Sequence, residues 1–164
     1  MLGIDCGTEC TGYGVVEIDS HHELRCIAFG GIALSRQVAM ADRLCTIFDR
    51  LSAVIEEHRP DQVAIEDVFY AVNVKSALKL GQARGVAMLA ASAQGLPVTE
   101  YAPLSIKSAV VGYGRAEKEQ VQAMVARLLH LEATPQPADA ADALAIAICD
   151  LHTAATLLRQ AAGR

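Results

Sequence analysis

Short apolar runs near the start of the chain predict three strands. They cover residues 2–5, 13–18 and 24–34, and glycines stand between and within them. Because only short connections separate the runs, we expect these strands to pair antiparallel to one another. Two consecutive glycines, Gly30 and Gly31, predict a bulge in the third strand.

From residue 40 onwards, helical patterns alternate with short buried strands. Helices are predicted at residues 40–58, 76–94, 105–110, 117–129 and 138–158, and strands at residues 63–66 and 98–101. This order predicts an α/β fold with a mixed five-stranded sheet flanked by helices, antiparallel at first and parallel later. We expect a single domain over residues 1–164, with a loosely ordered tail at residues 153–164.

Composition narrows the class of protein. With 164 residues, 52% of them hydrophobic, the chain can bury a full core. Its apolar runs, such as residues 143–149, are shorter than the ~20 residues of a membrane span, and its start lacks the basic region of a signal peptide. We therefore expect a cytoplasmic protein with no membrane partner. The five cysteines are an odd number without CxxC spacing, which favours buried, reduced thiols.

Charge is distributed unevenly along the chain, although the net charge is −5. Residues 1–67 carry twelve acids against five arginines, whereas residues 68–128 carry seven basic residues against three acids. A basic middle segment is suited to a phosphate-binding face on an otherwise acidic molecule. Scattered solubilising charge explains the same asymmetry equally well.

Four carboxylates occur next to apolar segments that are expected to be buried, where a charged side chain is unfavourable. Asp5 and Glu66 each end an apolar strand, and Asp139 and Asp142 are three residues apart on one face of the last predicted helix. Taken singly, each has an ordinary explanation: a turn residue, an edge charge or a helix cap. Their joint occurrence at strand ends and on a helix face favours one shared site.

Carboxylates gathered in one site repel each other unless cations neutralise them. Oxygen ligands without clustered histidine or cysteine select a hard ion such as Mg²⁺, with Mn²⁺ as a substitute. Two such ions about 4 Å apart support phosphodiester hydrolysis, with no protein nucleophile required. The pattern therefore predicts a magnesium-dependent nuclease.

Four longer stretches carry a more specific signal: LGIDCGTECTGYGVVE, VAIEDVFYAVNVKSALKLGQARG, VVGYGRAEKEQVQ and ADAADALAIAI, which together span residues 2–148. They resemble the RuvC family of bacterial Holliday junction resolvases. The resemblance implies a ribonuclease H-like fold, a homodimer and two Mg²⁺ per active site, held by Asp5, Glu66, Asp139 and Asp142. It also implies resolution of four-way junctions in recombination and repair. The expected reaction is a pair of symmetric nicks with 5′-phosphate and 3′-hydroxyl ends, made together with the RuvA–RuvB branch-migration complex.

The same resemblance implies roles for residues outside the acidic set. Lys107 is expected to act in catalysis and to contact DNA, and Phe69 and Tyr70 to stack on bases. Further DNA contacts are expected from Lys75, Lys79, Arg84, Arg115 and Lys118. Outside this family, such residues are ordinary solvated or loop side chains.

Two glycines stand inside the helix predicted at residues 76–94. Gly81 and Gly85 each cost roughly 1 kcal/mol relative to alanine, so we expect something to approach this helix closely. A partner helix across a twofold axis is the preferred explanation, and tight packing within the chain is the alternative.

The sequence departs from the family at Cys6, where a proline usually follows the first aspartate. The exchange loosens the turn and places a thiol beside the expected metals, which predicts some sensitivity to oxidation.

Three other functions remain open at this point. An ATP-binding domain of the actin and sugar-kinase type also begins with a strand ending in DxGT, which Asp5, Gly7 and Thr8 satisfy. A related nuclease of ribosomal RNA precursors shares the LGIDxG start. A junction-binding protein that has lost catalysis would share most of the motifs.

Overall fold

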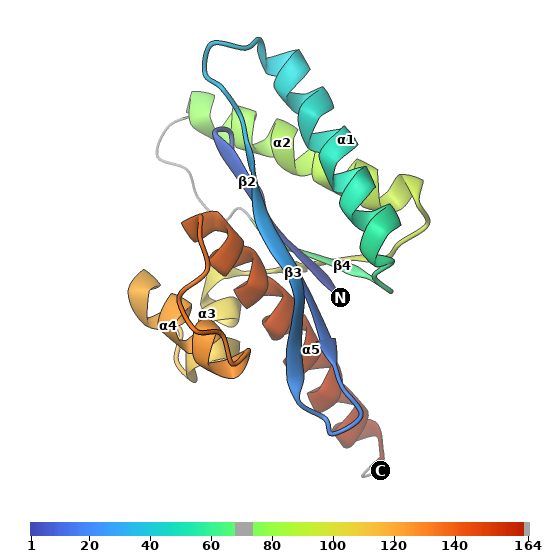
Figure 1. Cartoon of the computed structure of the whole chain (residues 1–164), viewed down its shortest axis with the longest axis vertical. Coiled ribbons are helices and arrows are strands. Elements are labelled where there is room, and N and C mark those ends of the chain that lie inside the picture. Colours follow the sequence, from blue (N-terminus) through green and yellow to red (C-terminus); the bar gives the residue numbers. More distant parts are fainter. Residues whose placement is uncertain (68–73, 163–164) are drawn as a thin grey trace.

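Five strands form one mixed sheet in the computed structural model, which describes residues 1–67 and 74–162 (Figure 1). The strands are β1 (Leu2–Asp5), β2 (Cys10–Ile18), β3 (Leu24–Ala33), β4 (Val63–Glu66) and β5 (Val98–Tyr101). Their order across the sheet is β3-β2-β1-β4-β5. The first three pair antiparallel, whereas β1–β4 and β4–β5 pair parallel, which confirms the predicted mixed sheet.

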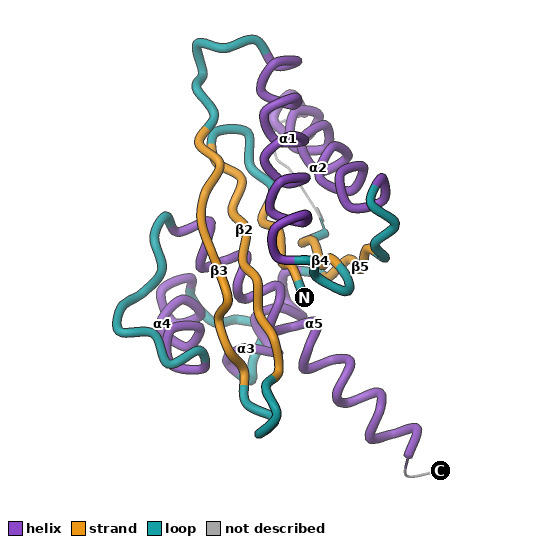
Figure 2. Tube along the Cα trace, turned by 45° about the vertical axis from the view of Figure 1, so that its right-hand side comes forward, coloured by secondary structure: helices purple, strands orange, loops and turns teal. Residues whose placement is uncertain are grey.

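Helices cover both faces of this sheet. Helices α1 (Met40–His58) and α2 (Val74–Ala93) pack on one face. Helices α3 (Pro103–Val111), α4 (Lys118–Leu128) and α5 (Ala138–Ala162) lie on the other, as the two views in Figures 1 and 2 show. Each face has its own buried cluster, so the sheet separates two hydrophobic cores.

Alternation along the strands decides which side chains face which helices. In β1, Leu2 and Ile4 join the cluster under α1 and α2, whereas Gly3 faces α5. Asp5 shares the direction of Gly3 and therefore points to the α5 side. In β4, Val63 and Ile65 face α1 and α2, so Glu66 also points to the α5 side.

Helix α5 approaches the sheet closely because glycines face it. A Cβ atom added at Gly12 would lie 2.0 Å from the carbonyl oxygen of Asp139, and one at Gly3 would lie 2.1 Å from that of Ala143. Only a residue without a side chain permits this spacing. The first turns of α5 are thereby held against β2 and β1, near the end of β1 that carries Asp5.

Two details of the sequence prediction are corrected. The register shift between β2 and β3 falls at Val15/Val16, not at the glycine pair. Gly30 and Gly31 instead continue the regular pairing; added Cβ atoms would lie 2.7 Å from the Tyr13 hydroxyl and 2.5 Å from Pro137 Cγ, respectively. The glycines are needed for space, not for a bulge.

The last helix is longer than the sequence pattern predicts. It continues through Ala162, so residues 153–162 belong to α5. Within the described residues, Ala138–Ala161 is the one helix that is long and apolar enough to cross a membrane. Its residues Ala143 to Cys149 are buried in the protein core, which accounts for that composition.

Candidate active site

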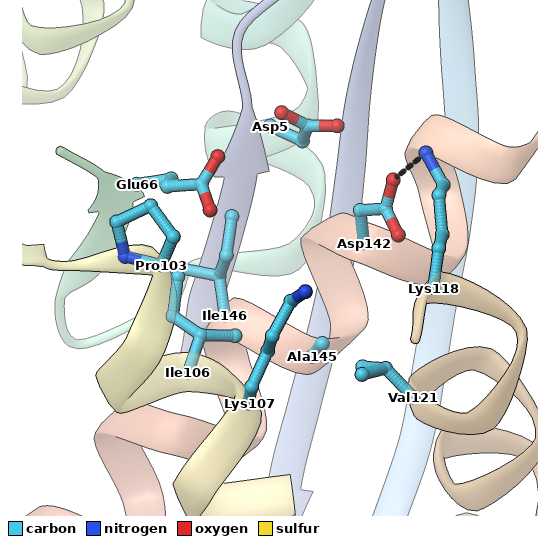
Figure 3. Close-up of a pocket in the computed structure, with 10 residues that line it drawn as sticks. All are labelled: Asp5, Glu66, Pro103, Ile106, Lys107, Lys118, Val121, Asp142, Ala145 and Ile146. Carbon is cyan, nitrogen blue, oxygen red and sulfur yellow. Dashed lines mark ion pairs between the residues drawn. The ribbon is translucent and has the colours of Figure 1, made fainter. Parts of the chain in front are cut away.

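Three of the four predicted acids line one pocket of about 240 Å³. Asp5 lies at the end of β1, Glu66 at the end of β4, and Asp142 in the second turn of α5. Figure 3 shows their carboxylates around the same space, above a floor that includes Ile106 and Ile146. The pocket thus joins parts of the chain that are far apart in sequence.

The topology explains this convergence. Strands β1 and β4 are parallel neighbours, so their carboxyl ends meet at the same edge of the sheet. The strand alternation turns Asp5 and Glu66 towards α5. The close approach of α5 then brings Asp142 opposite them (Figure 3).

The pocket holds more negative charge than its surroundings neutralise. Burial raises the pKa of Asp5 to about 7, and the charges of Asp142, Glu66 and Asp139 add to this shift, which Lys118 opposes. Burial and the charge of Asp142 also raise the pKa of Glu66, against the opposing charges of Lys107 and Lys118. Such perturbed carboxylates in a cleft are typical of functional sites.

Two lysines reach this pocket from α3 and α4. Lys118 Nζ lies 2.5 Å from Asp142 Oδ2, and this hydrogen bond raises the pKa of Lys118. Lys107 lines the pocket and donates a hydrogen bond to the carbonyl oxygen of Ala116 at 2.8 Å. Sequence reasoning missed Gln122, whose Nε2 donates to Asp142 Oδ1 at 3.4 Å. Its position one turn after Lys118 is the signal that would have pointed to it.

Asp139 stands beside the pocket and does not line it. It lies one turn before Asp142 and adds to the upward pKa shift of Asp5. On its other side is the Cys10 thiol, whose pKa is raised to about 11 by burial and then by the charge and hydrogen bonding of Asp139. The structure therefore gathers all four acids in one region but separates the fourth from the other three.

The donor set fits a hard divalent cation in its chemistry. Carboxylate oxygens dominate it, and a cation would offset both the burial and the neighbouring negative charge that raise the pKa of Asp5. As the side chains stand, no group of three or more His, Cys, Asp or Glu residues within 1–67 and 74–162 is arranged to hold a metal ion. Lys118 supplies the countercharge to Asp142 in this arrangement.

The predicted DNA-binding residues fall into three groups. Phe69 and Tyr70 lie outside the described residues. Lys75 and Lys79 on α2, and Arg115 between α3 and α4, are exposed. Arg84 has a side chain only 17% exposed and is paired with Asp67 and Glu100, so the structure gives it partners other than the expected phosphate.

The helix glycines are not explained by packing against residues 1–67 or 74–162. Added Cβ atoms at Gly81 and Gly85 would meet no described atom within 4 Å. That observation argues against tight packing with the described residues, and a partner helix stays a prediction.

The cysteines depart in part from expectation. All five are free; Cys149 is buried and Cys45 is exposed, which corrects the prediction of uniformly buried thiols. Burial, followed by the charge of Asp5, raises the pKa of Cys6 to about 12. The thiolate is the form of cysteine that reacts with oxidants, and a raised pKa makes the thiolate rarer at neutral pH. This shift therefore weakens the argument for an oxidation-sensitive Cys6.

A central mixed sheet in this order, with acids at the ends of its parallel strands and on a crossing helix, defines a ribonuclease H-like fold with a nuclease-type acidic pocket. Residues 1–150 match the family model described as crossover junction endodeoxyribonuclease RuvC. The chain belongs to the RuvC family of crossover junction endodeoxyribonucleases. This membership removes the ATP-binding alternative.

Individual relatives agree with that assignment. The crossover junction endodeoxyribonuclease RuvC of Koribacter versatilis is 64% identical over 159 residues, covering 97% of this chain and 96% of the relative. Among solved structures, Thermus thermophilus RuvC is similar with a TM-score of 0.86 and 35% identity, covering 95% of this chain and 96% of that one. A second structure, T. thermophilus RuvC in complex with Holliday junction substrate, has the same TM-score and coverage and 33% identity.

Proposed function

We propose that this chain resolves Holliday junctions in recombination and DNA repair. It is a structure-selective endonuclease that makes paired symmetric nicks and leaves 5′-phosphate and 3′-hydroxyl ends. The observation that carries the proposal is the convergence of Asp5, Glu66 and Asp142 in one pocket of a chain from this nuclease family. The similar T. thermophilus structure with Holliday junction substrate supports the choice of DNA.

Asp5, Glu66 and Asp142, with Asp139 beside them, would hold two Mg²⁺ per site, with Mn²⁺ as a substitute. When bound, these ions supply an activated water and stabilise the leaving 3′ oxygen. Lys107, which lines the same pocket, would stabilise the charge of the scissile phosphate. Lys118, which pairs with Asp142 in this structure, would contact the DNA backbone once a metal neutralised that carboxylate.

The remaining contacts to DNA follow from charge and exposure. The exposed Lys75, Lys79 and Arg115 are suited to phosphates, and binding should weaken steeply with added salt. Phe69 and Tyr70 would stack on bases at the opened crossover, each worth about 1–3 kcal/mol. An Arg84 contact to DNA is not part of this proposal, because that side chain is already paired.

A homodimer is proposed through the outer face of α2. Val74, Leu78 and Leu89 are 72%, 65% and 56% exposed, and helical spacing places them on one stripe with Gly81 and Gly85. An apolar stripe with two glycines suits close packing against a second copy. A twofold dimer would present two identical sites to the two equivalent strands of a junction.

The location proposed for this chain follows from the DNA-cutting activity that the names of its relatives give. We place it in the cytoplasm, working with the RuvA–RuvB branch-migration complex.

The proposal is tested with a synthetic four-way junction. Purified protein with Mg²⁺ should nick it at paired sites, spare the linear duplex of the same sequence, and stop on addition of EDTA. Junction binding without nicking would support the alternative of a catalytically impaired protein. Cleavage of RNA precursors alone would contradict the choice of substrate.

A further inference from the structure

We infer that Arg84 is a positioning residue that holds Glu66 in place from the opposite face of the sheet. The inference rests on the proposed function, because it concerns the geometry of the same acidic pocket. It also replaces the sequence-based expectation that Arg84 binds a DNA phosphate.

The contacts of Arg84 carry the inference. Its Nε donates a hydrogen bond to the carbonyl oxygen of Glu66 at 3.2 Å. Its Nη2 donates to Asp67 Oδ1 at 3.4 Å and to Glu100 Oε2. With a side chain only 17% exposed, the guanidinium is turned into the protein and engages three acceptors. This is the fork geometry in which arginine cannot be replaced by lysine without loss.

The three acceptors lie at or next to the ends of β4 and β5, close to the acidic pocket. Glu66 ends β4, and its carboxylate points to the pocket on the α5 side (Figure 3). Glu100 on β5 is paired in register with Ile65, so its side chain shares the α2 side, from which Arg84 comes. Arg84 therefore contacts the main chain of Glu66 from the α2 side of the sheet, while the Glu66 carboxylate points to the pocket on the α5 side.

Main-chain bonds fix the same strand end from the side. The amide of Asp67 donates to the carbonyl oxygen of Tyr101 at 2.8 Å, which ties the end of β4 to β5. Arg84 adds a tie to α2, so the end of β4 is held in two directions. Displacing a reacting group by about 1 Å can cost roughly 100-fold in rate, so such a restraint matters for Glu66.

The decisive variant is Arg84→Lys, which keeps the positive charge but cannot reach three acceptors. We expect its affinity for a four-way junction, and the salt dependence of that affinity, to stay within about twofold of wild type. We expect cutting with Mg²⁺ to slow by about 10–100-fold. Binding of Mn²⁺, followed by the electron paramagnetic resonance of the free ion, should weaken by about 10-fold.

Two further variants separate positioning from general stability. Glu100→Gln weakens the clamp without touching the pocket and should move the same readouts in the same direction by a smaller factor. In a Glu66→Gln background, Arg84→Lys should cause no additional loss of Mn²⁺ affinity, because the carboxylate it positions is gone. Circular dichroism verifies that each variant is folded.

Lys79→Gln serves as the matched comparison, because it removes a charge from the exposed side of the same helix. It should reduce the salt dependence of junction binding and leave Mn²⁺ affinity unchanged. The inference is overturned if Arg84→Lys keeps wild-type Mn²⁺ affinity and cutting, or if its Mn²⁺ loss persists fully in the Glu66→Gln background. Failure of the wild type to nick the junction would instead refute the proposed function.

Discussion

Replacing Asp5 with asparagine should stabilise the metal-free protein while abolishing cleavage. Burial raises the pKa of Asp5 from 3.8 to about 7, and the charges of three neighbouring carboxylates add to this shift. Between these two pH values, the folded state retains a proton that the unfolded chain releases. Stability therefore falls as pH rises through this window, and the full penalty is present above pH 7.

The size of the effect follows from the pKa shift. About three pH units at roughly 1.4 kcal/mol each give an upper limit of about 4 kcal/mol at neutral pH. Some 2–3 kcal/mol of this should develop between pH 5 and pH 8. Asparagine has no carboxyl proton to lose, so the free energy of unfolding of the variant should lack this part of the pH dependence.

Urea unfolding in EDTA at pH 5 and pH 8 measures the difference. The variant should gain stability over wild type from the lower to the higher pH. Mg²⁺ should then stabilise wild type, by about 2.7 kcal/mol at 100 times its dissociation constant, and the variant by much less. Glu56→Gln, which removes an exposed acid of α1, is the control and should show neither effect. A difference between wild type and Asp5→Asn that does not grow between pH 5 and pH 8 would refute the reasoning.

Three other outcomes follow from the site and the packing around it. Asp142→Asn should retain junction binding and lose cutting, because the carboxylate is removed while Lys118 stays available to DNA. Normal cutting in a nicking assay would contradict the assignment of Asp142 as a metal ligand. Leu78→Glu should shift the protein from dimer to monomer in analytical ultracentrifugation, and an unchanged mass would argue against the α2 interface. Gly12→Ala should lower the free energy of unfolding by about 1–3 kcal/mol, because its Cβ would clash with the backbone of Asp139. A urea midpoint equal to that of wild type would show that α5 can move away from the sheet without loss of stability.

The sheet could be predicted because its signals are local. Apolar runs ending at Asp5 and Glu66 mark two strands, and helices between later strands require parallel pairing. What the pattern misjudged depends on packing across the molecule. Gly30 and Gly31 resemble a bulge signal in sequence, yet their absent side chains make room for Tyr13 and Pro137.

The acidic set was predictable as a group but not in its details. Asp139 and Asp142 are equivalent in the sequence pattern, and only the placement of α5 puts Asp142 in the pocket and Asp139 beside Cys10. The partners of Arg84 could not be predicted from the sequence either. Its charge suggested a phosphate contact, whereas its true partners, Asp67 and Glu100, are determined by how α2 lies on the sheet.

The dependence of the pocket on α5 also has a consequence during synthesis. Asp5 is translated well before Asp142, because β1 precedes α5 along the chain. A nascent or truncated chain that lacks α5 therefore carries only half of the acidic set, so cutting ability should appear only after α5 has been synthesised and has packed on the sheet.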